Sequence, residues 1–146
     1  MACFYISGPM RGIPKFNFPA FDEAASRGRK LGHTVISPAD LDREIGHHED
    51  DLLDDVNVPA KMRLFAKRDC EALIGLRAEH GDGIALLPGY ERSTGAMTEL
   101  YLARWLDLRV VSAETWRPFT RHDLPKYNPG EDFILPNILA EYIVRG

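Results

Sequence analysis

Two hydroxyl residues and a carboxylate lie close together at the expected start of a helix, in the segment 91–100. The apolar run 84–87 precedes this segment and predicts a buried strand followed by a turn that contains glycine. Ser93 and Thr94 occupy positions where a helix begins, and Glu99 falls in its first or second turn. A helix N-terminus attracts anions through its free N–H groups and its dipole. The segment therefore predicts chemistry on a phosphorylated or sugar-like ligand.

A second candidate for anion binding follows the first predicted strand. The sequence Gly-Pro-Met-Arg-Gly at 8–12 comes directly after the apolar run 3–7. Small residues there allow the backbone to approach a ligand, and the Arg11 guanidinium can pair with a phosphate or a carboxylate. The spacing matches neither the dinucleotide fingerprint nor a Walker loop, because it lacks both Gly-x-Gly and Gly-Lys-Ser/Thr. A simple turn at the end of a strand is the alternative.

Asp69 lies in the middle of the apolar face of a helix predicted at 59–78. The apolar residues of that face are Met62, Phe65, Ala66, Ala72, Leu73 and Leu76. An ionised carboxylate in such a position is costly unless it pairs with a cation or lines a cavity. One interpretation is therefore a salt bridge with Arg68 or Arg11. The other is a carboxyl group in the ligand crevice, where desolvation raises its pKa toward values useful in acid–base catalysis.

Glu99 and Asp69 lie on separate predicted helices, and together they suit glycosyl transfer. In such reactions one carboxylate attacks the anomeric carbon and the other manages a proton. A Glu near a helix start can also do no more than stabilise the helix dipole, so this alternative stays open for Glu99.

The order of the predicted elements indicates an α/β protein with one domain over residues 1–146 and a core at about 3–112. Strands are expected at 3–7, 34–37, 84–87 and 108–112, and helices at 18–31, 59–78 and 95–106. This alternation predicts a parallel sheet with right-handed crossovers.

Two segments fall outside the alternation. The segment at about 40–58 is acidic and lacks periodicity, which predicts a solvated insertion. Its run His-His-Glu-Asp-Asp at 47–51 does not have the spacing of a zinc site, so we expect no metal. An irregular C-terminal arm is predicted at about 113–146, with a last helix at 134–144, and it could cover the site or form a dimer contact.

Composition and charge indicate which partners and which cellular compartment to expect. The chain has 146 residues, a net charge of −4 and a pI of about 5.7, which gives no basic face for duplex nucleic acid. Cys3 and Cys70 fall on predicted core elements and are expected to be buried free thiols in a reducing compartment. We find no signal peptide pattern and no apolar run long enough for a bilayer, so a cytoplasmic protein without membrane contact is expected.

Three motifs occur in a fixed order along residues 3–112. They are Phe-Tyr-Ile-Ser-Gly-Pro-Met at 4–10, Arg68-Asp69, and Ser-x-Gly-x-x-x-Glu-Leu-x-x-Ala at 93–103. Together they resemble the nucleoside 2-deoxyribosyltransferase superfamily, and the chain is most similar to small phage and bacterial members with Gly-Pro-Met-Arg-Gly and Leu-Leu-Pro-Gly. The resemblance implies a flavodoxin-like or Rossmann-like parallel sheet with helices on both faces, assembled as a homodimer or higher homo-oligomer.

The resemblance also implies roles for individual residues. Glu99 matches the nucleophile that attacks C1′ of a 2-deoxyribosyl group, Asp69 matches the Asp that helps to protonate the base, and Tyr5 matches a tyrosine that orients the nucleophile. The expected substrate-binding residues are Gly8, Met10, Arg11, Gly12, Ser93 and Gly95. No cofactor is implied.

Ser93 is a departure that bears on the substrate. Transferases that act on free nucleosides usually carry Asp six residues before the nucleophile, whereas the 2′-deoxynucleoside 5′-phosphate N-hydrolases of the superfamily carry Ser, which contacts the 5′-phosphate. A Ser accepts a dianion that an Asp would repel. We therefore expect hydrolysis of the N-glycosidic bond of a 2′-deoxynucleoside 5′-monophosphate. The alternatives are a transferase that exchanges bases and a nucleotide-sensing domain without turnover.

Overall fold

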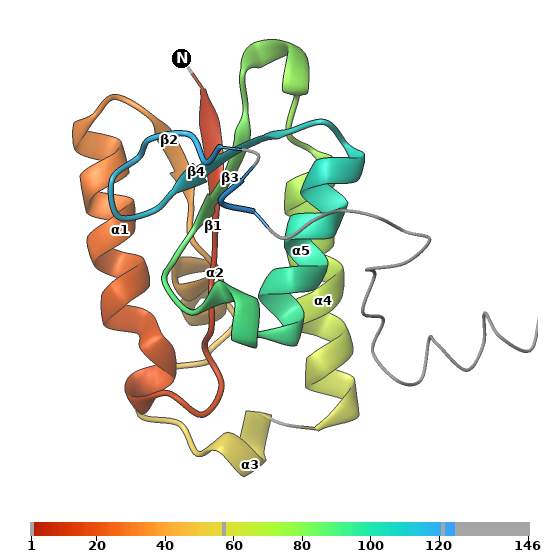
Figure 1. The fold of residues 1–146 in the computed structure, drawn as a ribbon. Coiled ribbons are helices and arrows are strands. Elements are labelled where there is room, and N and C mark those ends of the chain that lie inside the picture. The colour runs from red at the N-terminus through yellow and green to blue at the C-terminus, as the bar shows by residue number, and fades with distance from the viewer. Residues whose placement is uncertain (1, 57, 121, 125–146) are drawn as a thin grey trace, which may run out of the picture.

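Four parallel strands form the centre of the computed structural model, which describes residues 2–56, 58–120 and 122–124 (Figure 1). The strands are β1 (Cys3–Ser7), β2 (Thr34–Ile36), β3 (Gly83–Leu86) and β4 (Arg109–Ser112), in the spatial order β2-β1-β3-β4. β1 pairs in parallel with β2 and β3, and β3 pairs in parallel with β4. The predicted parallel α/β sheet is therefore confirmed, with each predicted strand within one residue of its observed bounds.

Helices cover both faces of the sheet, as predicted. α1 (Phe18–Lys30) lies on one face, whereas α4 (Pro59–Ile74) and α5 (Thr94–Trp105) lie on the other (Figure 1). Short 3-10 helices occur at Pro14–Asn17 (η1), Ala78–His80 (η2) and Tyr90–Arg92 (η3). α4 ends earlier than the expected 59–78, because Gly75 follows Ile74 as its C-cap and the chain then continues into η2.

The alternation of side chains along β1 divides the core into two layers. Phe4 and Ile6 pack in the layer that contains the buried face of α1. Tyr5 packs in the other layer with residues of α4 and α5, among them Leu100. Since successive strand residues point to opposite faces, Ser7 lies on the same face as Tyr5. β1 therefore presents two hydroxyl groups toward α5.

The predicted solvated insertion at 40–58 is wrong in part. Its first residues belong to α2 (Pro38–Glu44), and a second short helix, α3 (Leu53–Val56), follows. Asp42, His47 and Val56 are buried. Helices of one or two turns bury too few residues to show a helical period in the sequence. The sequence alone also does not distinguish a buried Asp from a solvated one.

The start of the predicted C-terminal arm belongs to the core. Trp116 and Ala113 are buried, and Val111 forms an antiparallel bridge with Pro118. Trp116 packs so closely on α1 that a Cβ added to Gly28 would lie 2.4 Å from the indole. The last predicted helix, at 134–144, lies outside the described residues.

A left-handed turn without glycine precedes α1. Lys15, Phe16 and Asn17 have φ angles of 58°, 53° and 61°, a region that costs L-residues roughly 1–2 kcal/mol each. Burial of the Phe16 ring and a 2.9 Å hydrogen bond from Asn17 Nδ2 to the Pro9 carbonyl hold this turn in place. The sequence contains no glycine that would have predicted such a conformation.

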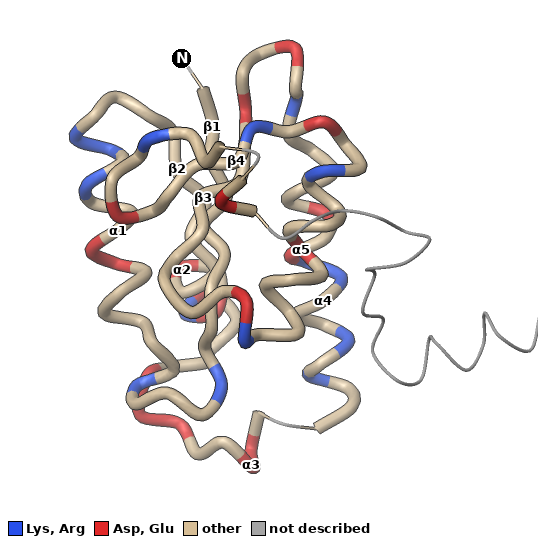
Figure 2. The backbone as a smooth tube through the Cα atoms, in the orientation of Figure 1, with Lys and Arg blue, Asp and Glu red and all other residues tan. Residues whose placement is uncertain are grey.

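Acidic and basic residues are interspersed over the fold (Figure 2). Within the described part of the chain, no helix is both long enough and apolar enough to span a bilayer.

Candidate active site

A cavity of about 560 Å³ opens at the carboxyl ends of β1 and β3. It lies between the 8–11 turn after β1, the 92–99 turn and helix start after β3, and one face of α4. β1 connects through α1 to β2 on one side of the sheet, whereas β3 and β4 extend the other side. The cavity therefore occupies the topological switch point, where open α/β sheets bind ligands.

Glu99 lies in the second turn of α5 and lines this cavity. The Tyr5 hydroxyl donates to Glu99 Oε2 at 2.5 Å, and the Ser7 hydroxyl donates to Oε1 at 2.7 Å. Burial raises the pKa of Glu99 to about 7, and the charge of Asp69 adds to this rise, while the two hydroxyl donors oppose it. The group can therefore exist in either protonation state near neutral pH.

Tyr5 remains a hydrogen-bond donor over the whole physiological range. Its side chain is fully buried, and burial together with the charge of Glu99 raises its pKa well above the ordinary value. A protonated hydroxyl in this position stabilises an ionised Glu99. Ser7 gives a second donor of the same kind. The sequence interpretation missed Ser7, although the two-residue spacing from Tyr5 places both side chains on one face of a strand.

Asp69 lines the cavity and also forms a salt bridge with Arg68. The salt bridge and the crevice position, which the sequence offered as alternatives, therefore occur at the same time. Arg68 Nε and Nη2 both donate to Asp69 Oδ1, at 3.0 and 2.7 Å. Burial raises the pKa of Asp69, while the charge of Arg68 opposes this rise. The Tyr5 hydroxyl also lies close enough to lower the pKa of Asp69. The structure thus brings Glu99, Asp69 and Tyr5 into one cluster.

Asp42 is a cavity residue that the sequence interpretation missed. It comes from α2, is buried, and forms an ion pair with Arg68 at 2.7 Å. Burial raises the pKa of Asp42, and Arg68 opposes this rise. Only the fold brings Asp42 to Arg68, 26 positions further along the sequence, so local patterns carried no signal of the contact.

Cationic and hydroxyl groups also line the cavity. Ser93 is the N-cap of α5, as predicted, and its Oγ accepts a 3.2 Å hydrogen bond from the Ala96 N–H. Arg11 also lines the cavity, as does Arg92, which was not predicted. Among the described residues, neither guanidinium forms an ion pair. These groups can bind an anion.

The other predicted substrate-binding residues line the cavity, with the exception of Gly12. Gly8, Met10 and Gly95 line the cavity, whereas Gly12 is not among its lining residues and lies in an exposed turn with φ +78°. Gly8 has a packing role as well, because a Cβ there would lie 2.7 Å from Leu87 Cβ.

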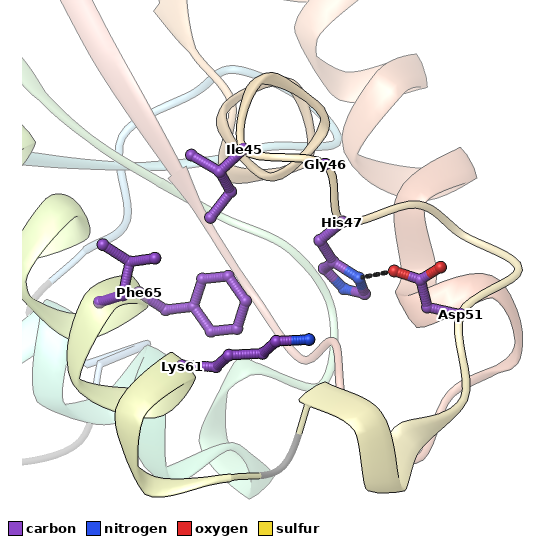
Figure 3. Close-up of a pocket in the computed structure, with 7 residues that line it drawn as sticks. Ile45, Gly46, His47, Asp51, Lys61 and Phe65 are labelled. Carbon is purple, nitrogen blue, oxygen red and sulfur yellow. Dashed lines mark hydrogen bonds and ion pairs between the residues drawn. The ribbon is translucent and has the colours of Figure 1, made fainter.

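A smaller pocket of about 80 Å³ adjoins the cavity and shares His47 and Phe65 with it. Figure 3 shows His47 pointing to Asp51, with Lys61 and Phe65 reaching in from α4. His47 Nδ1 lies 2.8 Å from Asp51 Oδ2. This pocket is too small for a nucleotide, so we place the candidate active site in the larger cavity.

The two cysteines differ from the prediction of buried thiols. Cys3 and Cys70 are both free and only partly buried, and Cys70 lines the cavity. Burial raises the pKa of the Cys70 thiol, and the charge of Glu99 adds to this rise. In the described ranges, no group of three or more His, Cys, Asp or Glu side chains is arranged to hold a metal ion.

The fold and the site together define a parallel α/β protein with a polar ligand cavity at the switch point of its sheet. Residues 2–112 match the family described as "Domain of unknown function (DUF4406)", and the chain belongs to this family. No curated protein and no solved structure matches the sequence.

Proposed function

We propose that this protein is an N-glycosidase that cleaves 2′-deoxynucleoside 5′-monophosphates into a free base and deoxyribose 5-phosphate. The observation that carries the proposal is the environment of Glu99, a cavity-lining carboxyl group with hydroxyl donors on both oxygens. The sequence resemblance to nucleoside 2-deoxyribosyltransferases supports the same chemistry. The cavity volume of about 560 Å³ lies within the range of small-molecule sites.

In the first step, an ionised Glu99 attacks C1′ and forms a glycosyl ester. The bond between C1′ and the base nitrogen breaks, and its electron pair leaves with the base. Asp69 gives its proton to the base, so that a neutral molecule departs. The raised pKa of Asp69 supports this role, because burial favours the protonated carboxyl group.

In the second step, water replaces the base. The water oxygen attacks C1′, the ester bond breaks, and its electron pair returns to Glu99. The water gives one proton to the ionised Asp69, which restores the starting protonation states. The two reactions together consume one water molecule and require no cofactor.

The phosphate is best accommodated by the cavity-lining arginines and the start of α5. Arg11 and Arg92 have no ion-pair partner among the described residues, and the α5 N-terminus adds free N–H groups. The Ser93 hydroxyl accepts a hydrogen bond from its own helix and can still donate its proton to a phosphate oxygen. These groups favour a nucleotide over an uncharged nucleoside.

The proposal is tested by Glu99→Gln, assayed for release of free base from a panel of nucleotides and nucleosides. We expect a loss of roughly a thousandfold or more in kcat, because the amide cannot act as a nucleophile. Glu91→Gln is the matched control, since Glu91 is exposed and does not line the cavity. Full activity of the Glu99 variant would show that the mechanism is wrong. A second free base in the assay separates transfer from hydrolysis, because only a transferase makes an exchanged nucleotide.

The preference for a phosphate is tested by Ser93→Asp. Aspartate can still cap the helix, but its charge opposes a phosphate at the same place. We expect KM for nucleotides to rise at least tenfold while KM for nucleosides changes little. An equal effect on both substrates would place the phosphate elsewhere.

A further inference from the structure

Arg68 joins two carboxyl groups from different parts of the chain. Its Nη2 lies 2.7 Å from Asp42 Oδ1 on α2 and 2.7 Å from Asp69 Oδ1 on α4, and its Nε also donates to Asp69 Oδ1. All three side chains are mostly buried, with exposures of 18% for Arg68, 6% for Asp42 and 19% for Asp69. One guanidinium charge is therefore shared between two carboxylates at the cavity wall.

Other polar groups surround this chain of contacts on every side. Asp69 is faced by Arg68 on its own helix, by Tyr5 on β1 and by Glu99 on α5, and Cys70 lies next to it. Asp42 is faced by Arg68, by Arg11 in the turn after β1, and by His47, whose Nε2 lies 3.9 Å from Asp42 Oδ2. Arg68 is the group that contacts both carboxylates at hydrogen-bond distance.

We propose that Asp42 is a positioning residue, which acts through Arg68 to keep Asp69 able to deliver a proton to the leaving base. This inference rests on the proposed function. It assigns a role to the acidic segment that the sequence pattern predicted to be solvated.

Asp42 influences Asp69 electrostatically through Arg68. A guanidinium paired with Asp69 alone would favour the ionised form of Asp69 and make it a poor acid. Asp42 draws on the same positive charge and adds a negative one nearby, so both effects favour a proton on Asp69. Burial raises the pKa of Asp69 against the opposing effect of Arg68, and the charge of Asp69 in turn raises the pKa of Asp42, so the two carboxyl groups influence each other.

Asp42 also influences the geometry of the contact between Arg68 and Asp69. Both Arg68 donors engage Asp69 Oδ1, so Arg68 leaves Oδ2 available to face a ligand. The ion pair with Asp42 is made by the same Nη2 atom that pairs with Asp69, so Asp42 restrains the part of the guanidinium that holds that carboxyl group. Asp42 therefore influences both the proton affinity and the direction of Asp69.

The test is Asp42→Asn, with kcat and KM for the best nucleotide measured from pH 5 to 9. Without the charge of Asp42, Arg68 stabilises the ionised form of Asp69 more strongly, so the alkaline limb of kcat should move to lower pH. We expect kcat at neutral pH to fall roughly tenfold, which is less than the hundredfold or more expected for Asp69→Asn, and KM to change less than threefold. Asp42→Glu restores the charge and should return the alkaline limb to its wild-type position.

Asp40→Asn is the matched control. It removes the same charge from the same helix, but its carboxyl group pairs with Arg29 and Arg43 at the surface. Its pH profile should match the wild type. Asp42→Ser repeats the neutral substitution with a smaller side chain if the Asn variant does not fold.

The inference would be overturned if a folded Asp42→Asn or Asp42→Ser variant kept the alkaline limb of kcat at its wild-type pH. It would also be overturned if the substitution changed KM and left kcat unchanged. That result is distinct from failure of the proposed function, which would appear as a wild-type protein that releases no base from any nucleotide or nucleoside.

Discussion

Removal of the Tyr5 hydroxyl should impair catalysis by making Glu99 harder to ionise. Tyr5 donates to Glu99 Oε2 at 2.5 Å from a fully buried position, and Phe fills the same space without the donor. A hydrogen bond to a charged group contributes about 1.5–3 kcal/mol, and one pKa unit corresponds to about 1.4 kcal/mol. Starting from a pKa of about 7, Glu99 in the Tyr5→Phe variant should therefore titrate roughly one to two units higher.

The kinetic consequence follows from the fraction of Glu99 that is ionised. At pH 7 about half of the wild-type carboxyl groups are ionised, compared with roughly 1–10% in the variant. We therefore expect kcat/KM at pH 7 to fall by about fivefold to fiftyfold, with most of the loss recovered at pH 9. The acid limb of the profile should move to higher pH by one to two units.

The assay is release of free base from one nucleotide, followed from pH 5 to 9 for both proteins. Use of the same substrate cancels the titration of its phosphate, which occurs near pH 6. Tyr90→Phe is the control, since Tyr90 is half-buried outside the cavity and its hydroxyl lies near Glu91 and Asp123. An acid limb that stays in place, or moves to lower pH, would refute the role of Tyr5 as a donor to the ionised nucleophile.

Two further predictions concern stability. The pKa of Glu99 rises from 4.5 to about 7 on folding, so its contribution is fully present below pH 4.5 and is lost as the pH rises through 7. Urea unfolding should therefore show the free energy of unfolding of Glu99→Gln rising by up to about 3 kcal/mol relative to the wild type between pH 4.5 and 8. Parallel curves for the two proteins would contradict the raised pKa of Glu99. Gly28→Ala should lose about 1–3 kcal/mol, because its Cβ would lie 2.4 Å from Trp116, whereas Gly75→Ala has no contact below 3.5 Å and should change stability by less than about 1 kcal/mol. Equal stability of the two alanine variants would show that Trp116 moves aside without cost.

Much of the fold could be predicted because the strands are buried on both faces. β3 is buried at every residue, and β1 at all but its first, so each reads as a continuous apolar or small-residue run. The Ser93 cap and the position of Glu99 could also be predicted, since a helix start is a local feature with its own residue preferences. Features that depend on the residues of a single helix or strand could therefore be predicted from the sequence.

The missed parts of the candidate site depend on contacts between distant segments. Asp42 is buried because α2 packs beside β1 and Arg68 reaches it from α4, and neither contact has a local sequence signal. The left-handed backbone of Phe16 is held by burial of its ring, not by a permissive residue type. The burial of His47 also depends on distant contacts, because its ring packs against Phe16 and Phe18. In each case tertiary packing overrides what the local sequence favours.

The hydrogen bonds to Glu99 have a consequence for folding. Its two donors lie 94 and 92 residues earlier in the chain, so the cluster forms only after a very long loop has closed. Closing a loop of that length costs about 4 kcal/mol of chain entropy, which the assembled sheet has to offset. A partly folded chain that contains only β1, α1 and β2 holds both hydroxyl groups but has no carboxyl group for them to activate. Recovery of base release during refolding should consequently lag behind the recovery of helical circular dichroism, since activity requires a contact between segments 92 or more residues apart, whereas helices form from local contacts.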